Sequence, residues 1–477
     1  KIDCGITVFG DPAQAIYGFT NEQESSLREN EEVLDQNFLS NIDVYWPNTF
    51  KTLQLKDIFR TDSSKLQNMF KNLRGLLIDD KDSKGYEIYN NVRDQVLALS
   101  DPNEKESFKW TDAKRLDHAL FLFRTRMEVV EASYYCCKHK LRHRLRLGGI
   151  NQLAMPVIGM IFENFRDEFI NFEQFKTLTK AKLKDLKTPE LNYIIRKKGR
   201  SINASQHLNH LINFLWEDLM VHCNYKKKLS IKHLRKFLSK KRPPLEMCEP
   251  ELNTSGAILG TIHASKGREK GDVILHYPIE KYKEKVKNSK TILEEARVLG
   301  VALTRPIHNI TVKTSTFNKL ETDYTDQHFN SLNIGRVIRK KANDYSYSVE
   351  IGLSDDLDES SFVNERLDLQ FVKEMQSFLR DIRDTKPIRV YANYNYEIKQ
   401  HELYTPSQIT MKDLKLSAKV PSFQKPFGLL SKQVNNDFWT LANYKGANKS
   451  WSFYPRASLN KIFIMGVKTV AIGTDDP

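Results

Sequence analysis

The sequence predicts a mixed α/β fold built on a parallel β-sheet. Two observations carry this prediction: short, continuous apolar runs recur along the chain, and stretches with helical spacing separate them. Continuous apolar runs are typical of strands that are buried on both faces, as strands of parallel sheets are. Alternation of such strands with helices is the pattern of α/β proteins.

Five apolar runs are predicted strands, and most of them lead into polar or glycine-bearing turns: 6–9, 119–123, 257–259, 272–275 and 310–312. Helices are predicted over 63–77 and 293–303. Ligands bind beyond the carboxyl ends of the strands in open parallel sheets. We therefore expect the polar residues that follow these runs to carry the chemistry.

Residues 131–250 differ in character from the rest of the chain. They hold 24 Lys and Arg against 11 Asp and Glu, whereas the whole chain has a net charge of +14. Helical spacing over 155–170, 205–223 and 231–240 predicts a basic helical insertion. Such charge suits a nucleic-acid phosphate backbone, and a solvated helical surface is the alternative.

Residues 316–477 are predicted to form a separate domain that contains β-strands, with strands within 345–353 and 388–398. An acidic stretch at 354–359 interrupts them, and we interpret it as a solvated loop and not as a metal site. No apolar run reaches the ~20 residues that a membrane span requires. The five cysteines have no zinc-site spacing, so we expect a cytoplasmic protein with reduced thiols.

The first candidate motif is GDPAQAIYGF at 10–19, directly after a predicted strand. Asp11 and Gln14 are placed where a strand-end loop can meet a phosphate or its attacking water. Tyr17 and Phe19 offer flat faces to an unstacked base, a contact that contributes ~1–3 kcal/mol per base. The structural alternative is a β-turn that Asp11 caps, with the aromatic rings in the core.

Three further motifs follow in order. Residues 55–61 contain Phe59 and Arg60, and residues 260–269 follow a strand and are rich in donors for oxyanions. Residues 294–305 read as a helix with Arg297 near its start and Arg305 near its end. An arginine over a developing γ-phosphate charge accelerates phosphoryl transfer by orders of magnitude. The alternative for this last motif is an amphipathic helix with helix-end charges.

In this order the four motifs resemble motifs III, IV, V and VI of the UvrD/Rep/PcrA family of superfamily 1 DNA helicases, whose patterns run close to GDxxQxIYxF, LxxNYRS, TIHxSKGLE and EERRLxYVAxTRA. The resemblance covers about 1–130 and 250–315, and 120–126 is similar to the family's LxRTxxxxR. It implies the end of a first RecA-like lobe over 1–54 and a second RecA-like lobe over 55–130 and 251–315. The helical insertion would span 131–250, and a C-terminal domain of unassigned function would span 316–477.

The resemblance also implies roles for single residues. Gln14, Arg60 and Arg305 would be catalytic, with both arginines on the γ-phosphate. Asp11, Phe59 and Glu269 would bind the nucleotide. Single-stranded DNA would contact Tyr17, Phe19, Arg124, Thr261 and His263.

The implied function is an ATP-dependent 3′–5′ DNA helicase or translocase that acts on single-stranded DNA and duplex junctions, with ATP and Mg²⁺ as cofactors and no membrane partner. The sequence contains no GxxxxGK[ST] loop and no DExQ motif, which lie upstream of the first motif in the family. We therefore expect the C-terminal portion of a longer helicase, whose Mg²⁺ ligands lie upstream, with essentially no ATPase activity of its own. The alternative is a non-catalytic DNA-binding or regulatory subunit.

The motifs depart from the family patterns at a few positions. The third reads KGRE where the family has KGLE, and Lys270 replaces the usual aromatic residue. Ala296 and Gly300 replace an arginine and a tyrosine of the last motif. Gly300 is expected to weaken its helix by ~1 kcal/mol relative to alanine.

Overall fold

The computed structural model describes residues 11, 13, 46–47, 49, 51, 53, 57–78, 85–105, 108–147, 154, 156–162, 165–183, 204–238, 247–248, 255–277, 289–314, 337–340, 347–353, 356–357, 361, 374, 379, 386–404, 426–443 and 458–465. The strand predicted over 6–9 and the candidate residues Gln14, Tyr17 and Phe19 lie outside these residues. Contacts divide the chain into two compact units. Unit 1 comprises Lys1–Ala132, Arg146–Gly148 and Ala257–Leu320, and unit 2 comprises Ser133–Leu145, Gly149–Gly256 and Glu321–Pro477.

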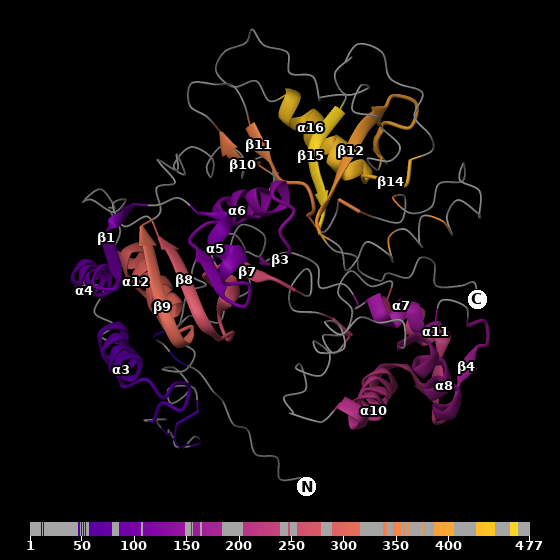
Figure 1. The fold of residues 1–477 in the computed structure, drawn as a ribbon, viewed down its shortest axis with the longest axis horizontal. Coiled ribbons are helices and arrows are strands. Elements are labelled where there is room, and N and C mark those ends of the chain that lie inside the picture. Colours follow the sequence, from indigo (N-terminus) through magenta and orange to yellow (C-terminus); the bar gives the residue numbers. More distant parts are fainter. Residues whose placement is uncertain are drawn as a thin grey trace. The chain divides into compact units, whose positions relative to one another are not determined.

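Unit 1 contains five strands that pair in parallel in the order β1-β9-β8-β2-β7 (Figure 1). Their bounds are β1 Ser100–Lys105, β2 Leu120–Phe123, β7 Ala257–Thr261, β8 Lys270–Tyr277 and β9 Pro306–Thr314. Four of the predicted strands are therefore present, and the prediction of an α/β fold with a parallel sheet is confirmed. The strand β1 was not predicted, because its sequence is polar and contains no apolar run.

Both faces of this sheet are buried, which explains the continuous apolar runs. Leu120 and Leu122 of β2 join a core with helices α3 (Ser64–Ile78), α4 (Gly85–Leu97) and α12 (Ser289–Leu303). Phe121 and Phe123 turn to the other face, where both rings pack edge-on against Phe108. On that face Asp112 of α5 (Trp110–Arg115) forms an ion pair of 2.7 Å with Lys313 of β9.

The predicted helices of unit 1 are present as α3 and α12. In α3 the buried residues follow helical spacing at Leu66, Phe70, Leu73 and Leu77, and the Ser63 hydroxyl accepts a hydrogen bond from the Leu66 amide at 3.4 Å. Gly300 of α12 is closely approached by the Leu77 side chain, whose Cδ1 atom a methyl group at position 300 would meet. Glycine at this position thus allows α12 and α3 to pack closely.

The middle segment of unit 2 is helical, as predicted, but it also contains strands. Its helices are α7 Pro156–Phe162, α8 Phe172–Leu183, α10 Ala204–Cys223 and α11 Ile231–Leu238, around a shared apolar core. The helix predicted over 155–170 is wrong at 165–170, because this stretch is not helical and β4 (Phe169–Ile170) pairs with β6 (Lys228–Ser230). The antiparallel order β4-β6-β5 is completed by β5 (Asn224–Tyr225).

The C-terminal segment of unit 2 contains β-strands, which confirms the prediction of strands in this segment, whereas a separate domain over 316–477 stays a prediction. Its four-stranded antiparallel sheet has the order β14-β13-β12-β15, with β12 Ile388–Asn395, β13 Gln400–Tyr404, β14 Gly428–Leu429 and β15 Ser458–Ile464. The helix α16 (Lys432–Asn443) packs its Val434 and Phe438 into the core of this sheet, and β10 (Val337–Lys340) pairs with β11 (Tyr347–Val349).

The interpretation of 354–359 as a solvated loop is wrong for Asp356. Its side chain is buried, and Oδ2 accepts hydrogen bonds from the backbone amides of Gly352 at 2.7 Å and Leu353 at 3.0 Å. These donors replace the water that a surface carboxylate would bind.

Among the described helices, none is long and apolar enough to cross a membrane. The described cysteines, Cys136, Cys137, Cys223 and Cys248, are buried free thiols.

Candidate functional site

The described candidate residues of unit 1 lie at two opposite edges of the parallel sheet. Because all five strands run in one direction, their amino ends share one edge and their carboxyl ends share the other. Arg124 follows β2 and Thr261 ends β7, so both lie at the carboxyl edge. Glu269 and Arg305 directly precede β8 and β9, so both lie at the amino edge. Glu269 and Arg305 therefore lie in segments that enter strands, and not beyond the carboxyl ends, where we expect the chemistry.

At the amino edge, an ion pair joins Arg60 to Glu269. The Arg60 Nε atom lies 2.7 Å from Glu269 Oε1, and the same guanidinium donates a hydrogen bond to the carbonyl oxygen of Thr304. The two side chains are 28% and 36% exposed. Arg60 thus connects the segment before α3 with the segments that enter β8 and β9.

Arg305 is buried beside this ion pair, with 1% of its surface exposed. Its Nε donates to the Val301 carbonyl at 2.8 Å, and Nη2 donates to the Thr304 hydroxyl at 2.9 Å. The pKa of Arg305 is lowered to about 10, mainly by burial and also by the charge of Arg60, while Glu269 and Asp11 oppose the shift. Arg305 remains a cation at pH 7, and its guanidinium is fixed in direction by the end of α12.

Lys266 and Asp11 complete what we term the amino-edge cluster: Asp11, Arg60, Lys266, Glu269 and Arg305. Burial lowers the pKa of Lys266, Arg305 lowers it further, and Asp11 opposes the shift. Asp11 Oδ1 accepts a hydrogen bond from the Ala13 amide at 3.2 Å, which agrees with the alternative in which Asp11 caps a turn. The same oxygen lies 3.7 Å from Arg74 Nε. Lys266 was not singled out from the sequence, although it lies within the third motif.

The amino-edge cluster has the chemistry of an anion site. It brings three cationic side chains, Arg60, Lys266 and Arg305, close enough to lower the pKa values of two of them. An anion such as a phosphate group would relieve that repulsion. The ring of Phe59, next in the chain to Arg60, is 92% exposed and is therefore accessible to a planar ligand.

The described residues do not offer Mg²⁺ a ligand set. No group of three or more His, Cys, Asp and Glu side chains is placed to hold a metal ion in the described part of the chain. Asp11 and Glu269 of the amino-edge cluster each lie against an arginine. We therefore assign no metal ligand to these residues.

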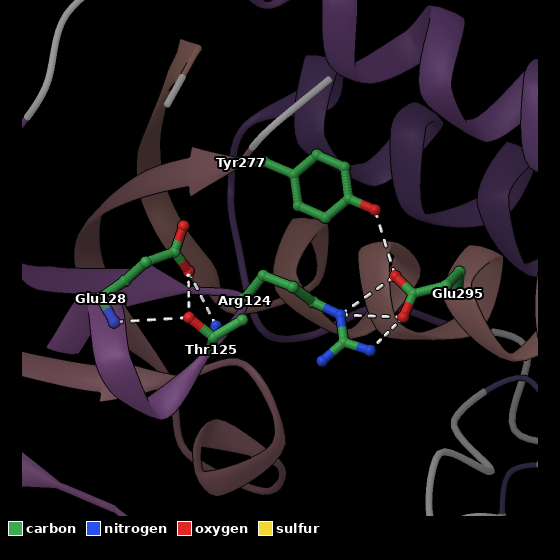
Figure 2. A network of polar contacts seen from close by, with 5 residues as sticks. All are labelled: Arg124, Thr125, Glu128, Tyr277 and Glu295. Atoms are coloured by element: carbon green, nitrogen blue, oxygen red, sulfur yellow. Dashed lines mark hydrogen bonds and ion pairs between the residues drawn. The ribbon is translucent and has the colours of Figure 1, made fainter. Parts of the chain in front are cut away.

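At the carboxyl edge, Arg124 is held by the carboxylate of Glu295, and Figure 2 shows this arrangement. The Arg124 Nε donates to both oxygens of Glu295, at 2.8 Å and 3.0 Å, and a terminal nitrogen completes the ion pair. The Tyr277 hydroxyl donates a hydrogen bond to Glu295 Oε2 at 3.2 Å. The Glu295 side chain is only 7% exposed, so this is a largely buried ion pair, and we term Arg124, Tyr277 and Glu295 the carboxyl-edge network.

The residue after Arg124 begins a helix through a reciprocal pair of hydrogen bonds (Figure 2). The Thr125 amide donates to Glu128 Oε2 at 2.8 Å, and the Glu128 amide donates to the Thr125 hydroxyl at 3.3 Å. This capping box starts α6 (Arg126–Lys138) directly after β2. It fixes the backbone on the carboxyl side of Arg124, as Glu295 fixes the side chain.

Thr261 and His263 lie close to the carboxyl-edge network. The Thr261 hydroxyl accepts a hydrogen bond from the Ala264 amide at 3.2 Å, within the short helical turn His263–Ser265. The pKa of His263 is lowered to about 4, mainly by burial and also by the charge of Arg124, while Glu295 opposes the shift. His263 is therefore a neutral imidazole at pH 7, able to exchange hydrogen bonds but not to pair as a cation.

The structure thus brings Asp11, Arg60, Glu269 and Arg305 together at one edge and Arg124, Thr261 and His263 together at the other. Glu295 and Tyr277, which position Arg124, were not predicted as site residues, because their roles depend on partners far away in the chain. In comparisons with known proteins, no model of a protein family matches the chain, and a search of curated proteins finds no match.

Proposed function

We propose that the chain is the C-terminal half of an ATP-dependent 3′–5′ DNA helicase or translocase, and that the parallel sheet of unit 1 belongs to its second RecA-like lobe. The observation that carries this proposal is the amino-edge cluster. It brings Arg60 and Arg305, to which the resemblance assigns γ-phosphate contacts, near one another and near Lys266. Cations that are close enough to repel one another are best stabilised by a polyanion such as a triphosphate.

In this proposal Arg60 and Arg305 would contact the γ-phosphate, and the exposed ring of Phe59 would stack on adenine. Glu269 would give up its ion pair with Arg60 and would instead accept a hydrogen bond from a ribose hydroxyl. Hydrolysis of bound ATP supplies the energy for movement along DNA. The chain contains no GxxxxGK[ST] sequence, so we assign to it only contacts from the γ-phosphate side.

We assign the DNA contacts to the carboxyl edge. The Thr261 hydroxyl and the neutral imidazole of His263 can form hydrogen bonds with a sugar-phosphate backbone, and Arg124 can add a charge-assisted one. The basic residues within 131–250 would contribute the salt-dependent part of the affinity.

Nucleotide binding is the first test. Fluorescence anisotropy of a methylanthraniloyl-labelled ATP should report weak binding to the full chain, and Arg60→Gln should weaken it by about tenfold, because one charge-assisted hydrogen bond contributes about 1.5–3 kcal/mol. The matched control is Arg115→Gln, which removes the same charge from a side chain that is 75% exposed. Equal losses in both variants, or no binding to the wild type, would contradict the nucleotide site.

DNA binding is the second test. The affinity for a labelled single strand should fall steeply with salt, because neutralised phosphates release counterions. Absent or salt-independent binding would contradict the proposed function. DNA binding that neither nucleotide nor Arg60→Gln alters would instead support the non-catalytic DNA-binding subunit.

A further inference from the structure

A short β-hairpin of unit 2 has an unfavourable turn. Strands β5 and β6 pair Asn224 with Leu229 and Tyr225 with Lys228, so Lys226 and Lys227 form a two-residue turn. Both turn residues have positive φ angles, 49° and 63°. Turns of this kind usually contain Asn-Gly, because a side chain in the left-handed region costs roughly 1–2 kcal/mol. Two lysines therefore occupy turn positions that usually hold Asn-Gly.

The hairpin is held firmly at its base. Leu229 is fully buried in the core of the helical segment, and β6 pairs with β4 through Leu229 and Ser230. The rings of Phe169 and Tyr225 stack with centroids 5.3 Å apart, and Lys226 Nζ lies 5.4 Å from the Tyr225 centroid. Asn224 Oδ1 accepts a hydrogen bond from the Lys227 amide at 3.0 Å. The turn lysines are thus presented from a preformed support, which lowers the entropy lost when they bind a partner.

The charged residues of the hairpin and of the helix that follows it are all basic. Asn224 to Lys228 are all exposed, and residues 224–238 contain six lysines and arginines and no acidic residue. Helix α11 follows at once, with Leu234 and Leu238 buried and Lys232 and Lys236 exposed. The exposed acidic residues Asp167 and Glu168 lie in the turn before β4, outside the hairpin.

We propose that this lysine hairpin, residues 224–230, binds the phosphate backbone of duplex nucleic acid. A two-stranded β-ribbon fits the major groove, which is about 12 Å wide, and Lys226, Lys227 and Lys228 would lie against the phosphates that line it. A single strand is less suitable, because proteins bind it largely by stacking bases on free aromatic faces. The Tyr225 ring is already stacked on Phe169 with Lys226 over it. This inference rests on the proposed function. It adds a binding site for the duplex to the contacts that the proposed helicase makes with a single strand.

The test is the double variant Lys226→Gly/Lys227→Gly, which removes two charges and relieves the turn. Duplex affinity, measured by anisotropy, should fall by about one to two orders of magnitude at 0.1 M salt, and the slope of log K against log salt should fall by about 2. Glycine suits this turn, so the melting temperature should not decrease. A loss of affinity therefore cannot be assigned to unfolding.

The chain offers a matched control in Lys140→Gly/Lys399→Gly. These two lysines are also exposed and also have positive φ angles, 55° and 56°, so the control removes the same charge and relieves the same kind of strain elsewhere in unit 2. It should keep the wild-type duplex affinity within about twofold. The double variant Lys226→Arg/Lys227→Arg retains the charge and should also keep the wild-type duplex affinity.

The outcomes separate the inference from the proposed function. A wild-type chain that binds neither single-stranded nor duplex DNA would contradict both. If the wild type binds DNA but the hairpin variant and its control bind the duplex equally well, only the hairpin inference fails. It also fails if the variant loses single-strand and duplex affinity to the same extent, or if the lysines are needed for binding anionic lipid vesicles and not DNA.

Discussion

The two edges of the parallel sheet hold their charges in different ways. At the amino edge, Arg60, Lys266 and Arg305 face the carboxylates of Glu269 and Asp11, and the Arg60–Glu269 ion pair is partly exposed. At the carboxyl edge, the largely buried carboxylate of Glu295 is matched by Arg124 and Tyr277. One edge therefore holds three described cations beside two described carboxylates, whereas the other has a network that holds one arginine in a fixed direction.

This contrast separates stability from binding. Removing one partner of a buried ion pair leaves an uncompensated charge in a poorly solvated place, which is costly. Removing one partner of a partly exposed pair costs little, because water replaces it. We therefore expect substitutions at the carboxyl edge to change folding most, and substitutions at the amino edge to change ligand affinity most.

The largest effect on stability is expected at Glu295. Glu295→Ala leaves Arg124 and Tyr277 without their shared acceptor and should lower the free energy of unfolding by about 2–3 kcal/mol in urea denaturation, because Arg124 is still 27% exposed. Glu87→Ala, at an exposed acidic residue of α4, is the control and should change it by less than about 0.5 kcal/mol. A loss below 1 kcal/mol at Glu295 would mean that the network is not a stabilising one.

The next largest effect is expected from acidification, which should lower the free energy of unfolding through a histidine near the carboxyl edge. His276 of β8 is buried and stacks on Phe123 with ring centroids 4.9 Å apart, near the Lys313–Asp112 ion pair. The pKa of His276 is lowered to about 3, mainly by burial and also by the charge of Lys313, while Asp112 opposes the shift. The unfolded chain therefore binds more protons than the folded chain below pH 6.5, and stability falls as the pH falls.

Urea unfolding at several pH values checks this. His276 alone should remove about 2 kcal/mol between pH 6.5 and pH 5, because each pH unit contributes about 1.4 kcal/mol, and His276→Phe should remove that dependence. His263 and His143, whose pKa values burial also lowers, add a dependence of the same sign that remains in the variant. Stability that rises on acidification, or an unchanged slope in His276→Phe, would contradict the role of His276.

A smaller effect is expected in α12, the helix that carries Glu295 and leads into Arg305. Gly300→Ala should destabilise unit 1 by about 1 kcal/mol, because the new methyl group meets Leu77, although alanine favours a helix. Gly75→Ala in α3 is the matched control: its methyl group meets nothing, so it should stabilise by about 0.5–1 kcal/mol. Thermal melts that give both substitutions the same sign would show that helix propensity governs position 300.

The smallest effect on stability is expected at Glu269. Glu269→Gln should lower the free energy of unfolding by less than about 1 kcal/mol, because its ion pair with Arg60 is partly exposed. The same variant should bind inorganic tripolyphosphate more tightly in calorimetric titration, because the carboxylate that competes for Arg60 is gone. Asp94→Asn, which removes the partner of Arg93 in α4, should leave this affinity unchanged. Weaker binding in Glu269→Gln would contradict the anion site.

Much of the fold of unit 1 follows from the sequence, because buried parallel strands must be apolar along their whole length. The runs at 119–123, 257–259, 272–275 and 310–312 correspond to β2, β7, β8 and β9. The strand β1 was missed because it lies at the end of the sheet order, where a polar sequence with Pro102 is tolerated. The hairpin of β5 and β6 was missed because Lys-Lys is not a turn signal.

By itself the sequence determined the parallel α/β fold and the residue types that suit phosphate chemistry, since apolar periodicity and side-chain chemistry are local properties. It did not determine which charges meet. Arg124 and Glu295 are 171 positions apart, and only the register of β2 beside β8 and the packing of α12 bring them together. Likewise, tertiary structure alone placed Glu269 and Arg305 at the amino edge, because they lie in segments that enter β8 and β9. Ion pairs and burial depend on distances in space, which spacing along the chain does not specify.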